Sequence, residues 1–159
     1  MSATIFFLLV SCVGFIQMVP IVEDVCPVRL YDTGSSCSGL ITVDKLCNES
    51  IANLAESTLK TCDAVQLTWS YPMRNLTITI ETPYTQQHQD YSIEIDNRNF
   101  YESTFHLFRI LNGEEISINT PDESVTVKSD SKYQVQLKIV APYTISLYIL
   151  NINYKVAKI

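Results

Sequence analysis

From Val65 to the C-terminus, apolar and polar residues alternate with a period of two, and this pattern constrains the fold more than any other feature. A period of two places successive side chains on opposite faces of a β-strand. The alternating segments are short and are separated by turn signals such as Asn112-Gly113, which is typical of hairpins. The pattern predicts an all-β domain of about eight strands, built as an antiparallel β-sandwich or β-prism.

The segment Val65–Glu81 contains the only tryptophan, Trp69, and a Pro-containing turn between two expected strands. Leu67 and Trp69 share one strand face, and the apolar residues of the second strand also share one face. We therefore expect a hairpin whose two strands both contribute to the core. The residues expected on these inner faces are Leu67, Trp69, Tyr71, Leu76, Ile78 and Ile80.

The first 22 residues carry no charged side chain and include the apolar run Ile5–Val10. A run of this length followed by small residues is typical of a signal peptide, predicted here as residues 1–14 with a boundary that could extend to about 20. No Lys or Arg precedes the run, and an uncleaved membrane anchor is the alternative. Gln17 and Pro20 interrupt the apolar stretch, and a spanning helix needs about 20 apolar residues. We expect no stable membrane span in the mature chain.

Four cysteines follow the predicted signal and lie close together in the sequence. An even number of cysteines in a secreted chain predicts two disulfides, and the spacing alone does not select among three connectivities. The histidines His88 and His106 are far away and no C-x-x-C motif occurs, so we expect neither a zinc site nor another cofactor. The predicted disulfide residues are Cys26, Cys37, Cys47 and Cys62.

Residues 21–64 form a cysteine-containing N-terminal segment that we expect to share one domain with the β-sandwich of residues 65–159. Val25–Tyr31 can form a short strand, and Pro27 favours an edge position. Cys47–Lys60 has apolar residues at helical spacing and predicts one short helix with Asn48 as its N-cap.

The net charge of −6, from 11 basic and 17 acidic side chains, limits the kinds of partner. No basic run or stripe is present, so we expect no nucleic-acid partner. Two sequons, Asn48-Glu49-Ser50 and Asn75-Leu76-Thr77, predict N-glycosylation of Asn48 and Asn75. Asn75 has the parity of the outward-facing Thr77 and Thr79, so a glycan there would point to solvent.

The motif Asp32-Thr33-Gly34-Ser35-Ser36 resembles the catalytic turn of pepsin-type aspartic proteases. That chemistry needs two carboxylates that share a proton, and the chain has no second Asp-Thr-Gly. No G-x-S-x-G elbow occurs either. We therefore expect a surface turn at Asp32 and no enzymatic activity, with an aspartic-type hydrolase as the less favoured alternative.

From Cys62 onward, the order of features is similar to the luminal domain of lysosome-associated membrane glycoproteins. The residues that carry this resemblance are Cys62, Leu67-Thr68-Trp69, Asn75–Ile80, Tyr91–Ile95, Thr120-Pro121 and Ser131-Lys132-Tyr133. Gln134 stands where the family has a cysteine. The resemblance implies a glycosylated β-prism in a lumen, with a shielding or partner-binding role.

Together these patterns predict a secreted or luminal glycoprotein that binds another protein or a glycan. A structural coat or matrix glycoprotein is the alternative, and the endolysosomal lumen is the alternative location. Binding is expected at three loops, Pro83–Asp90, Asn97–Ser103 and Asn119–Glu123. The tyrosines that can supply contact area are Tyr84, Tyr91 and Tyr101.

Overall fold

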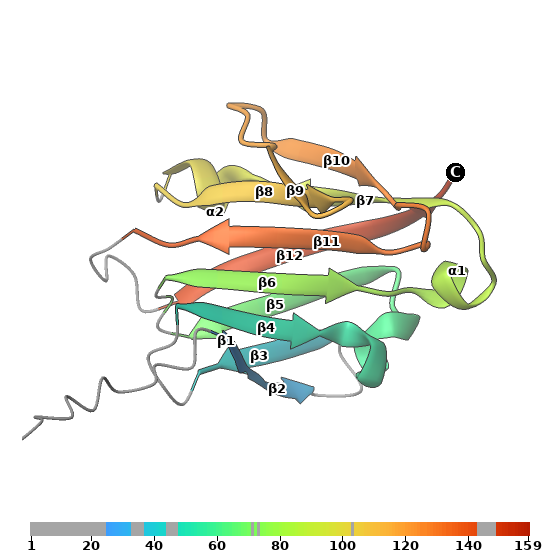
Figure 1. Cartoon of the computed structure of the whole chain (residues 1–159), viewed down its shortest axis with the longest axis horizontal. Coiled ribbons are helices and arrows are strands. Elements are labelled where there is room, and N and C mark those ends of the chain that lie inside the picture. The colour runs from blue at the N-terminus through green and yellow to red at the C-terminus, as the bar shows by residue number, and fades with distance from the viewer. Residues whose placement is uncertain are drawn as a thin grey trace, which may run out of the picture.

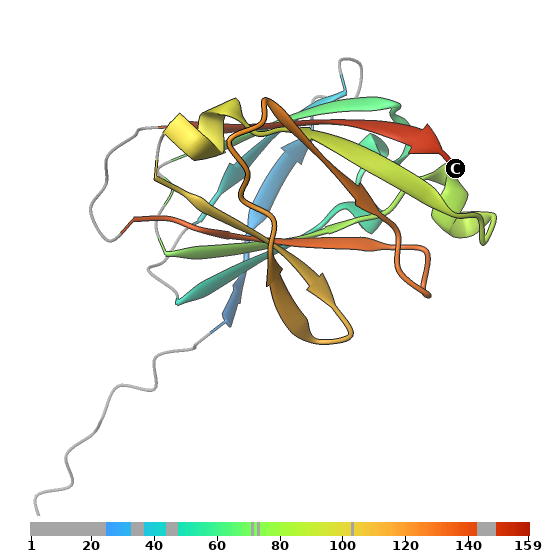
Figure 2. The same ribbon diagram turned by 90° about the horizontal axis from the view of Figure 1, so that it is seen from above.

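The computed structural model describes residues 25–32, 37–43, 48–70, 72, 74–102, 104–142 and 149–159. These residues form twelve strands in two six-stranded sheets that pack face to face (Figures 1 and 2). The predicted all-β sandwich is therefore confirmed, with more strands than the eight expected. The predicted signal peptide, Cys47 and the residues Thr33–Ser36 lie outside the described residues.

Sheet A consists of six strands in the order β1-β4-β6-β11-β8-β9. Their bounds are β1 Val25–Pro27, β4 Glu49–Asn53, β6 Asn75–Ile80, β11 Val135–Val140, β8 His106–Leu111 and β9 Glu114–Ser117. β4 runs parallel to both of its neighbours, and the other pairings are antiparallel.

Sheet B has the order β10-β7-β12-β5-β3-β2. Its strands are β10 Ser124–Lys128, β7 Tyr91–Asp96, β12 Ile149–Lys158, β5 Ala64–Ser70, β3 Ser38–Thr42 and β2 Arg29–Asp32. Only β3 and β5 pair in parallel in this sheet. The expectation of a purely antiparallel architecture is wrong for the strands near the N-terminus, because β3 and β4 each pair in parallel with a strand of the later alternating segment.

The core lies between the sheets and is filled by one parity of each central strand. Trp69 is fully buried and meets Phe105 edge-on, with ring centroids 6.4 Å apart. Each fully buried Leu or Ile contributes about 1.5 to 3 kcal/mol relative to its exposed state, so these strands supply the main driving force for folding. The Tyr91 hydroxyl donates to the Ile80 carbonyl oxygen across 2.9 Å and joins β7 to β6 of the opposite sheet.

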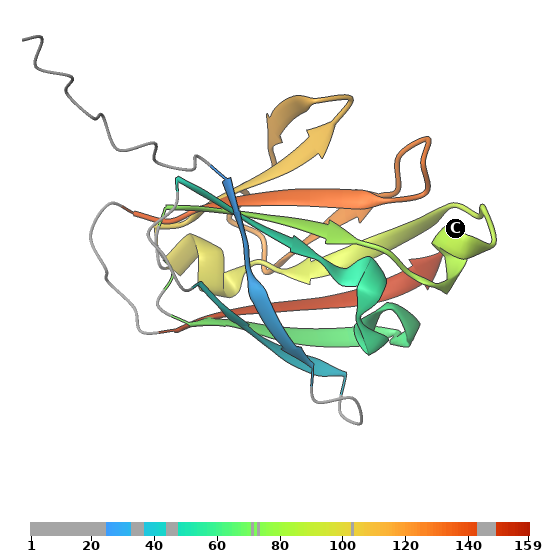
Figure 3. The ribbon, with the colours of Figure 1, turned by 60° about the horizontal axis from the view of Figure 1, so that its bottom comes forward.

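The chain passes from one sheet to the other at both sides of the sandwich. On one side, β1 of sheet A continues into β2 of sheet B with only Val28 between them (Figure 3). On the other side, residues 118–123 connect β9 of sheet A to β10 of sheet B. We refer to these as the β1–β2 side and the β9–β10 side.

The expected hairpin at Val65–Glu81 is wrong in its connection, although its inner faces are right. β5 belongs to sheet B and β6 to sheet A, so the link between them is a crossover between sheets. Leu67, Trp69, Leu76, Ile78 and Ile80 are all buried, as the parity predicts, whereas Tyr71 lies outside the described residues. Alternation reports which face is buried but not whether the opposing apolar face belongs to the same sheet.

The predicted helix over Cys47–Lys60 is replaced by β4 and two short 3-10 helices, η1 Leu54–Glu56 and η2 Thr58–Thr61. Ser50 and Ala52 are buried in the sandwich, whereas Ile51 is exposed. The parallel pairing of β4 with β6 supplies ladder hydrogen bonds that outweigh a weak helical preference. The α-helices are α1 Pro83–Gln86 and α2 Arg98–Glu102, which lie at opposite ends of the molecule in Figure 1.

The Asn-Gly turn lies between β8 and β9. Asn112 and Gly113 have φ of 54° and 83°, as a tight hairpin turn between these strands requires, so the predicted Asn-Gly hairpin is confirmed. In β12, the alternate residues Leu150, Ile152 and Tyr154 are buried and face the core. Within the described ranges, no helix is long and apolar enough to cross a bilayer.

Candidate functional site

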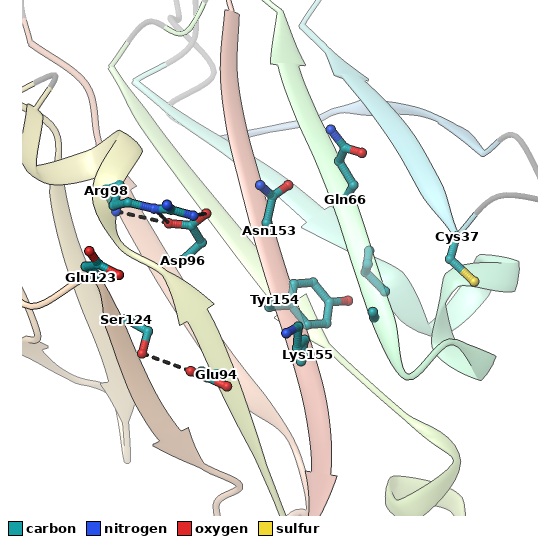
Figure 4. Close-up of a pocket in the computed structure, with 12 residues that line it drawn as sticks. Cys37, Gln66, Glu94, Asp96, Arg98, Glu123, Ser124, Asn153, Tyr154 and Lys155 are labelled. Atoms are coloured by element: carbon teal, nitrogen blue, oxygen red, sulfur yellow. Dashed lines mark hydrogen bonds and ion pairs between the residues drawn. The ribbon is translucent and has the colours of Figure 1, made fainter.

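The candidate site is a groove on the outer face of sheet B, with a volume of about 590 Å³. It runs over β5, β12 and β7 toward the start of β10 (Figure 4). The outward parity of three adjacent strands supplies its floor, because alternate residues of each strand point away from the core. Its lining residues are Cys37, Ala64, Val65, Gln66, Glu94, Asp96, Arg98, Glu123, Ser124, Asn153, Tyr154 and Lys155.

The strand register places amides and charges side by side on this floor. Asn153 of β12 pairs with Gln66 of β5, and Lys155 pairs with Glu94 of β7. Figure 4 shows Asn153 and Gln66 next to each other on neighbouring strands. The Asn153 Oδ1 atom is buried without a hydrogen-bond partner. Rigid strands therefore hold hydrogen-bonding groups at fixed positions across the groove.

One wall of the groove is an ion pair at the start of α2. Arg98 donates from Nε to Asp96 Oδ1 and from Nη2 to Asp96 Oδ2, both across 3.0 Å. The hydrogen bond from Arg98 holds the pKa of the Asp96 carboxyl below its usual value, with a smaller contribution from Asn153. Asp96 therefore keeps its negative charge to lower pH than a free aspartate does.

The same wall continues into the crossover before β10. The Ser124 hydroxyl donates to Glu94 Oε1 across 2.9 Å. Asn97, which is 1% exposed, holds this crossover through its side chain. Its Nδ2 donates to the carbonyl oxygens of Thr120 and Asp122, and its backbone N–H donates to Glu123. A buried asparagine thus positions Glu123 and Ser124 beside the groove.

The chemistry of the groove follows from the side chains that line it. The Ser124 hydroxyl contacts a carboxylate, and no histidine lines the groove to act as the base that a nucleophilic serine needs. In the part of the chain that the structure describes, no three His, Cys, Asp or Glu side chains gather closely enough to hold a metal ion. The polar groups of the lining are carboxylates, one guanidinium, one ammonium, amides, the Ser124 hydroxyl and the phenol of Tyr154.

The predicted glycosylation residues lie on the opposite face of the sandwich. Asn48 is exposed, and Asn75 is half-buried at the start of β6. Glu49 pairs with Asn75 in the register, so the two asparagines lie at the same end of the outer face of sheet A. The Arg74 Nη1 donates to Asn48 Oδ1, and Thr77 Oγ1 donates to Glu49 Oε1. Modification of both residues stays a prediction.

Among the predicted disulfide residues, Cys37 and Cys62 are bonded to each other with Cα atoms 5.9 Å apart. Cys26 is also disulfide-bonded. The Cys37–Cys62 bond lies where β3 meets β5, because the Gln66 N–H donates to the Cys37 carbonyl oxygen across 3.0 Å. It therefore joins the residue before β3 to the residues just before β5, the strand that forms one border of the groove.

The Asp32 carboxylate accepts hydrogen bonds from the N–H and the hydroxyl of Thr58, at 2.7 Å and 2.6 Å. Thr58 begins η2, so the carboxylate satisfies a backbone donor at that helix start. Asp32 is the last residue of β2, and Thr33 and Gly34 lie outside the described residues, so the surface-turn interpretation stays a prediction.

Two of the three predicted binding loops meet at the groove. Asn97–Ser103 contributes Arg98, and Asn119–Glu123 contributes Glu123. Pro83–Asp90 contains α1 at the other end of the molecule and lines no part of it. Ser103 lies outside the described residues.

The tyrosines behave differently from the expected contact surface. Tyr91 is fully buried and belongs to the core, so its expected role as a binding tyrosine is wrong. Its hydroxyl has an internal partner and Tyr84 stacks on its ring with centroids 6.2 Å apart, which leaves no face for a ligand. The side chain of Tyr101 lies outside the described atoms.

Comparison with known proteins provides little further constraint. No family model and no curated protein matches the chain. The solved structures that are similar include the periplasmic inhibitor of g-type lysozyme from Aeromonas hydrophila, PliG, at 5% identity and a TM-score of 0.38. That match covers 69% of this chain and 94% of the inhibitor. The resemblance to lysosome-associated membrane glycoproteins stays a prediction.

Sequence reasoning missed the groove because its residues come from four separate strands, from helix α2 and from the segments before β3 and β10. Glu94 and Asp96 have outward parity in the sequence, and parity alone equally fits solvated surface charges. The order of strands in sheet B brings them next to Asn153 and Lys155, and no local pattern encodes that order.

Proposed function

We propose that this chain is a secreted or luminal domain that acts by binding a protein partner through the groove of sheet B. The observation that carries the proposal is the groove itself. Fixed strands present charged and hydrogen-bonding side chains in a concave surface, which is the arrangement that gives specificity in protein recognition. We propose no catalytic step for it.

Three further features support this proposal. Disulfide bonds are typical of secreted and luminal proteins, because cytosolic thiols are kept reduced. The predicted glycans lie on the outer face of sheet A and leave the groove uncovered. The groove lining also contains no exposed aromatic ring, since Tyr154 is 3% exposed, and this favours a protein over a glycan that stacks on an aromatic face.

The test compares two glutamine-to-arginine variants on opposite faces. Gln66→Arg puts a long cation into the groove, whereas Gln136→Arg makes the same change on the outer face of sheet A. The folded, disulfide-bonded chain is immobilised, and partners from the surrounding extracellular fluid are captured and quantified. We expect a saturable partner to be retained by the wild type and by Gln136→Arg, and lost by Gln66→Arg. Equal capture by both variants, or the absence of any saturable partner, contradicts the proposal.

The glycan alternative is distinguished in the same experiment. The extracellular fluid is treated with a glycosidase before it is applied to the immobilised chain. This treatment removes a glycan ligand but leaves a protein surface in place. Binding that survives this treatment supports the protein partner.

A further inference from the structure

A small apolar patch lies on the outer face of sheet B, beside the groove lining. Tyr31 of β2 is 51% exposed and Leu40 of β3 is 37% exposed, and the two residues pair across the strands. Leu30 and Ile41 alternate with them and pack into the core, so Tyr31 and Leu40 have the outward parity. We call this pair the Tyr31/Leu40 patch. Tyrosine is among the residues that most often anchor protein interfaces.

The strand register makes the patch continuous with the groove. Ser38 pairs with Gln66 at the border of the groove, and Leu40 pairs with Thr68 two residues further along. Thr68 in turn pairs with Asn151 of β12, and the two side chains are hydrogen-bonded across 3.2 Å. An apolar contact surface and a polar groove therefore lie next to each other on one rigid sheet. Protein interfaces combine these two kinds of surface.

The charges of the groove indicate what the other end of this surface accepts. Three carboxylates line the groove against two cations, and these residues are Glu94, Asp96, Glu123, Arg98 and Lys155. Arg98 bonds to both oxygens of Asp96, and Lys155 pairs with Glu94 in the strand register. The excess negative charge therefore lies at Glu123, which Figure 4 shows at one end of the groove. A cation on the partner would balance this charge.

The spacing between the patch and Glu123 limits the shape of the partner. Leu40 lies in β3 and Glu123 directly precedes β10, so they are separated by four strand spacings in sheet B. At about 4.8 Å per spacing, this separation is roughly 19 Å. An extended segment covers that distance in about six residues, and residues six apart in such a segment point to the same side.

We propose that the protein partner enters the groove as an extended segment that crosses the strands of sheet B. An apolar side chain of this segment packs on the Tyr31/Leu40 patch, and a Lys or Arg six residues away binds at Glu123. The side chain of Leu40 offers no hydrogen bond to a sugar, so the patch favours an apolar side chain over a glycan. This inference rests on the proposed binding function of the groove and adds the chemistry of the segment that it accepts.

The test uses synthetic peptides, titrated to about 5 mM against the folded, disulfide-bonded chain and followed by NMR of its backbone amides. The probe is a nine-residue peptide with Leu at its second position, Arg at its eighth position and Ser or Thr elsewhere. Three control peptides replace Leu by Ser, replace Arg by Glu, or move Arg to the seventh position, where it points to the opposite side. We expect saturable shifts in β3 and at the start of β10 for the probe, and at least about fivefold weaker binding of each control.

Two pairs of variants test the two ends of the surface. Leu40→Ser should weaken the probe at least about fivefold, whereas Ile51→Ser, at a residue 39% exposed on the outer face of sheet A, should bind it like the wild type. Glu123→Gln should remove the preference for Arg over Glu in the peptide. Its control is Glu114→Gln on β9, which should keep that preference. Thermal unfolding checks that each variant is folded.

This inference and the proposed function can fail separately. A captured protein partner that Gln66→Arg loses, but that Leu40→Ser and Glu123→Gln retain in full, leaves the groove as a protein-binding site and overturns the extended segment. A probe without saturable shifts, or one that binds no better than its controls, also overturns it. So does a glucose hexasaccharide that shifts the same amides when the probe does not, because the patch then binds a glycan.

Discussion

The β1–β2 side and the β9–β10 side of the sandwich both contain a crossover between the sheets, but different interactions stabilise them. At both sides the chain leaves one sheet and enters the other, which exposes backbone groups that the sheets no longer pair. On the β1–β2 side, β2 pairs with β3, and the Cys37–Cys62 disulfide joins the residue before β3 to the residues before β5. The β9–β10 side is held by the side chains of Asn97, Asn119 and Arg109.

These three side chains of the β9–β10 side each bond to backbone groups. Asn119 accepts from the Leu107 N–H and donates to the Phe105 carbonyl oxygen across 3.2 Å. Arg109 reaches from sheet A to the Lys128 carbonyl oxygen of sheet B across 2.8 Å. A disulfide stabilises chiefly by restricting the unfolded chain, whereas these contacts act only in the folded state. We therefore expect loss of the disulfide to act mainly through the unfolded chain, and loss of these hydrogen bonds to loosen the β9–β10 side of the folded chain.

The largest effect is expected from removal of the disulfide. Replacing Cys37 and Cys62 together by Ala opens a loop with a sequence separation of 25 residues. We expect the free energy of unfolding to fall by about 3 to 4 kcal/mol, because the unfolded chain regains loop entropy. Urea denaturation measures the change. A loss below about 1 kcal/mol would mean that the β1–β2 side depends on its packing instead.

Loss of Asn97 should have the next largest effect and should act locally. Asn97→Ala removes two hydrogen bonds from a buried side chain to backbone carbonyl oxygens, for an expected loss of about 2 to 3 kcal/mol. Hydrogen exchange should also accelerate at the amides of β10, because the crossover that positions this strand is released. The control is Asn99→Ala, which removes a single bond to the Asn151 carbonyl oxygen and should cost about half as much. Unchanged exchange in β10 would show that Asn97 does not hold this side.

The smallest effect is expected for Tyr91. Its hydrogen bond joins β7 to β6 and belongs to neither the β1–β2 side nor the β9–β10 side. Burial raises its pKa from 10.0 to about 12, so only the unfolded state loses this proton between those values. Stability should therefore be constant with respect to this group below pH 10.0 and fall as the pH rises toward about 12. Tyr91→Phe should cost about 1 kcal/mol at neutral pH through the lost bond to Ile80.

The pH dependence of this variant supplies its own control. Burial also raises the pKa of Tyr154, so the wild type and Tyr91→Phe should both lose stability in alkali. The wild type should lose more, since two buried phenols contribute in it. Equal alkaline losses measured by urea denaturation would show that Tyr91 ionises as freely in the folded state as in the unfolded state.

Local pattern predicted the strands better than it predicted their neighbours. The parity of Leu67 and Trp69 correctly identified the core face of β5, and Asn112-Gly113 identified a hairpin. The same reasoning placed β5 and β6 in one hairpin and read β4 as part of a helix. Both errors concern which distant segment a strand meets, which a repeat of two or 3.6 residues does not record.

The candidate site, too, was predictable where it depends on local pattern and not where it depends on which strands are neighbours. Sequence reasoning selected the loops that contain Arg98 and Glu123, because polar loop segments between strands usually carry function. It did not connect them to Asn153 and Lys155, because Asn153 lies 55 residues after Arg98 and 30 residues after Glu123. Only the antiparallel pairing of β12 with β7 joins these groups into one groove.

The amino-acid sequence by itself determined that this chain is a β-sheet protein with a buried Trp69, an apolar parity on each strand and a cysteine-bearing N-terminal segment. These properties depend on the alternation of side chains along one strand. The tertiary structure alone decided that strands of the N-terminal segment enter both sheets, that Asn97 holds the β9–β10 side, and that a groove lies across β5, β12 and β7. The physical reason is that strand order is set by packing between faces far apart in sequence, and many orders satisfy the same local pattern.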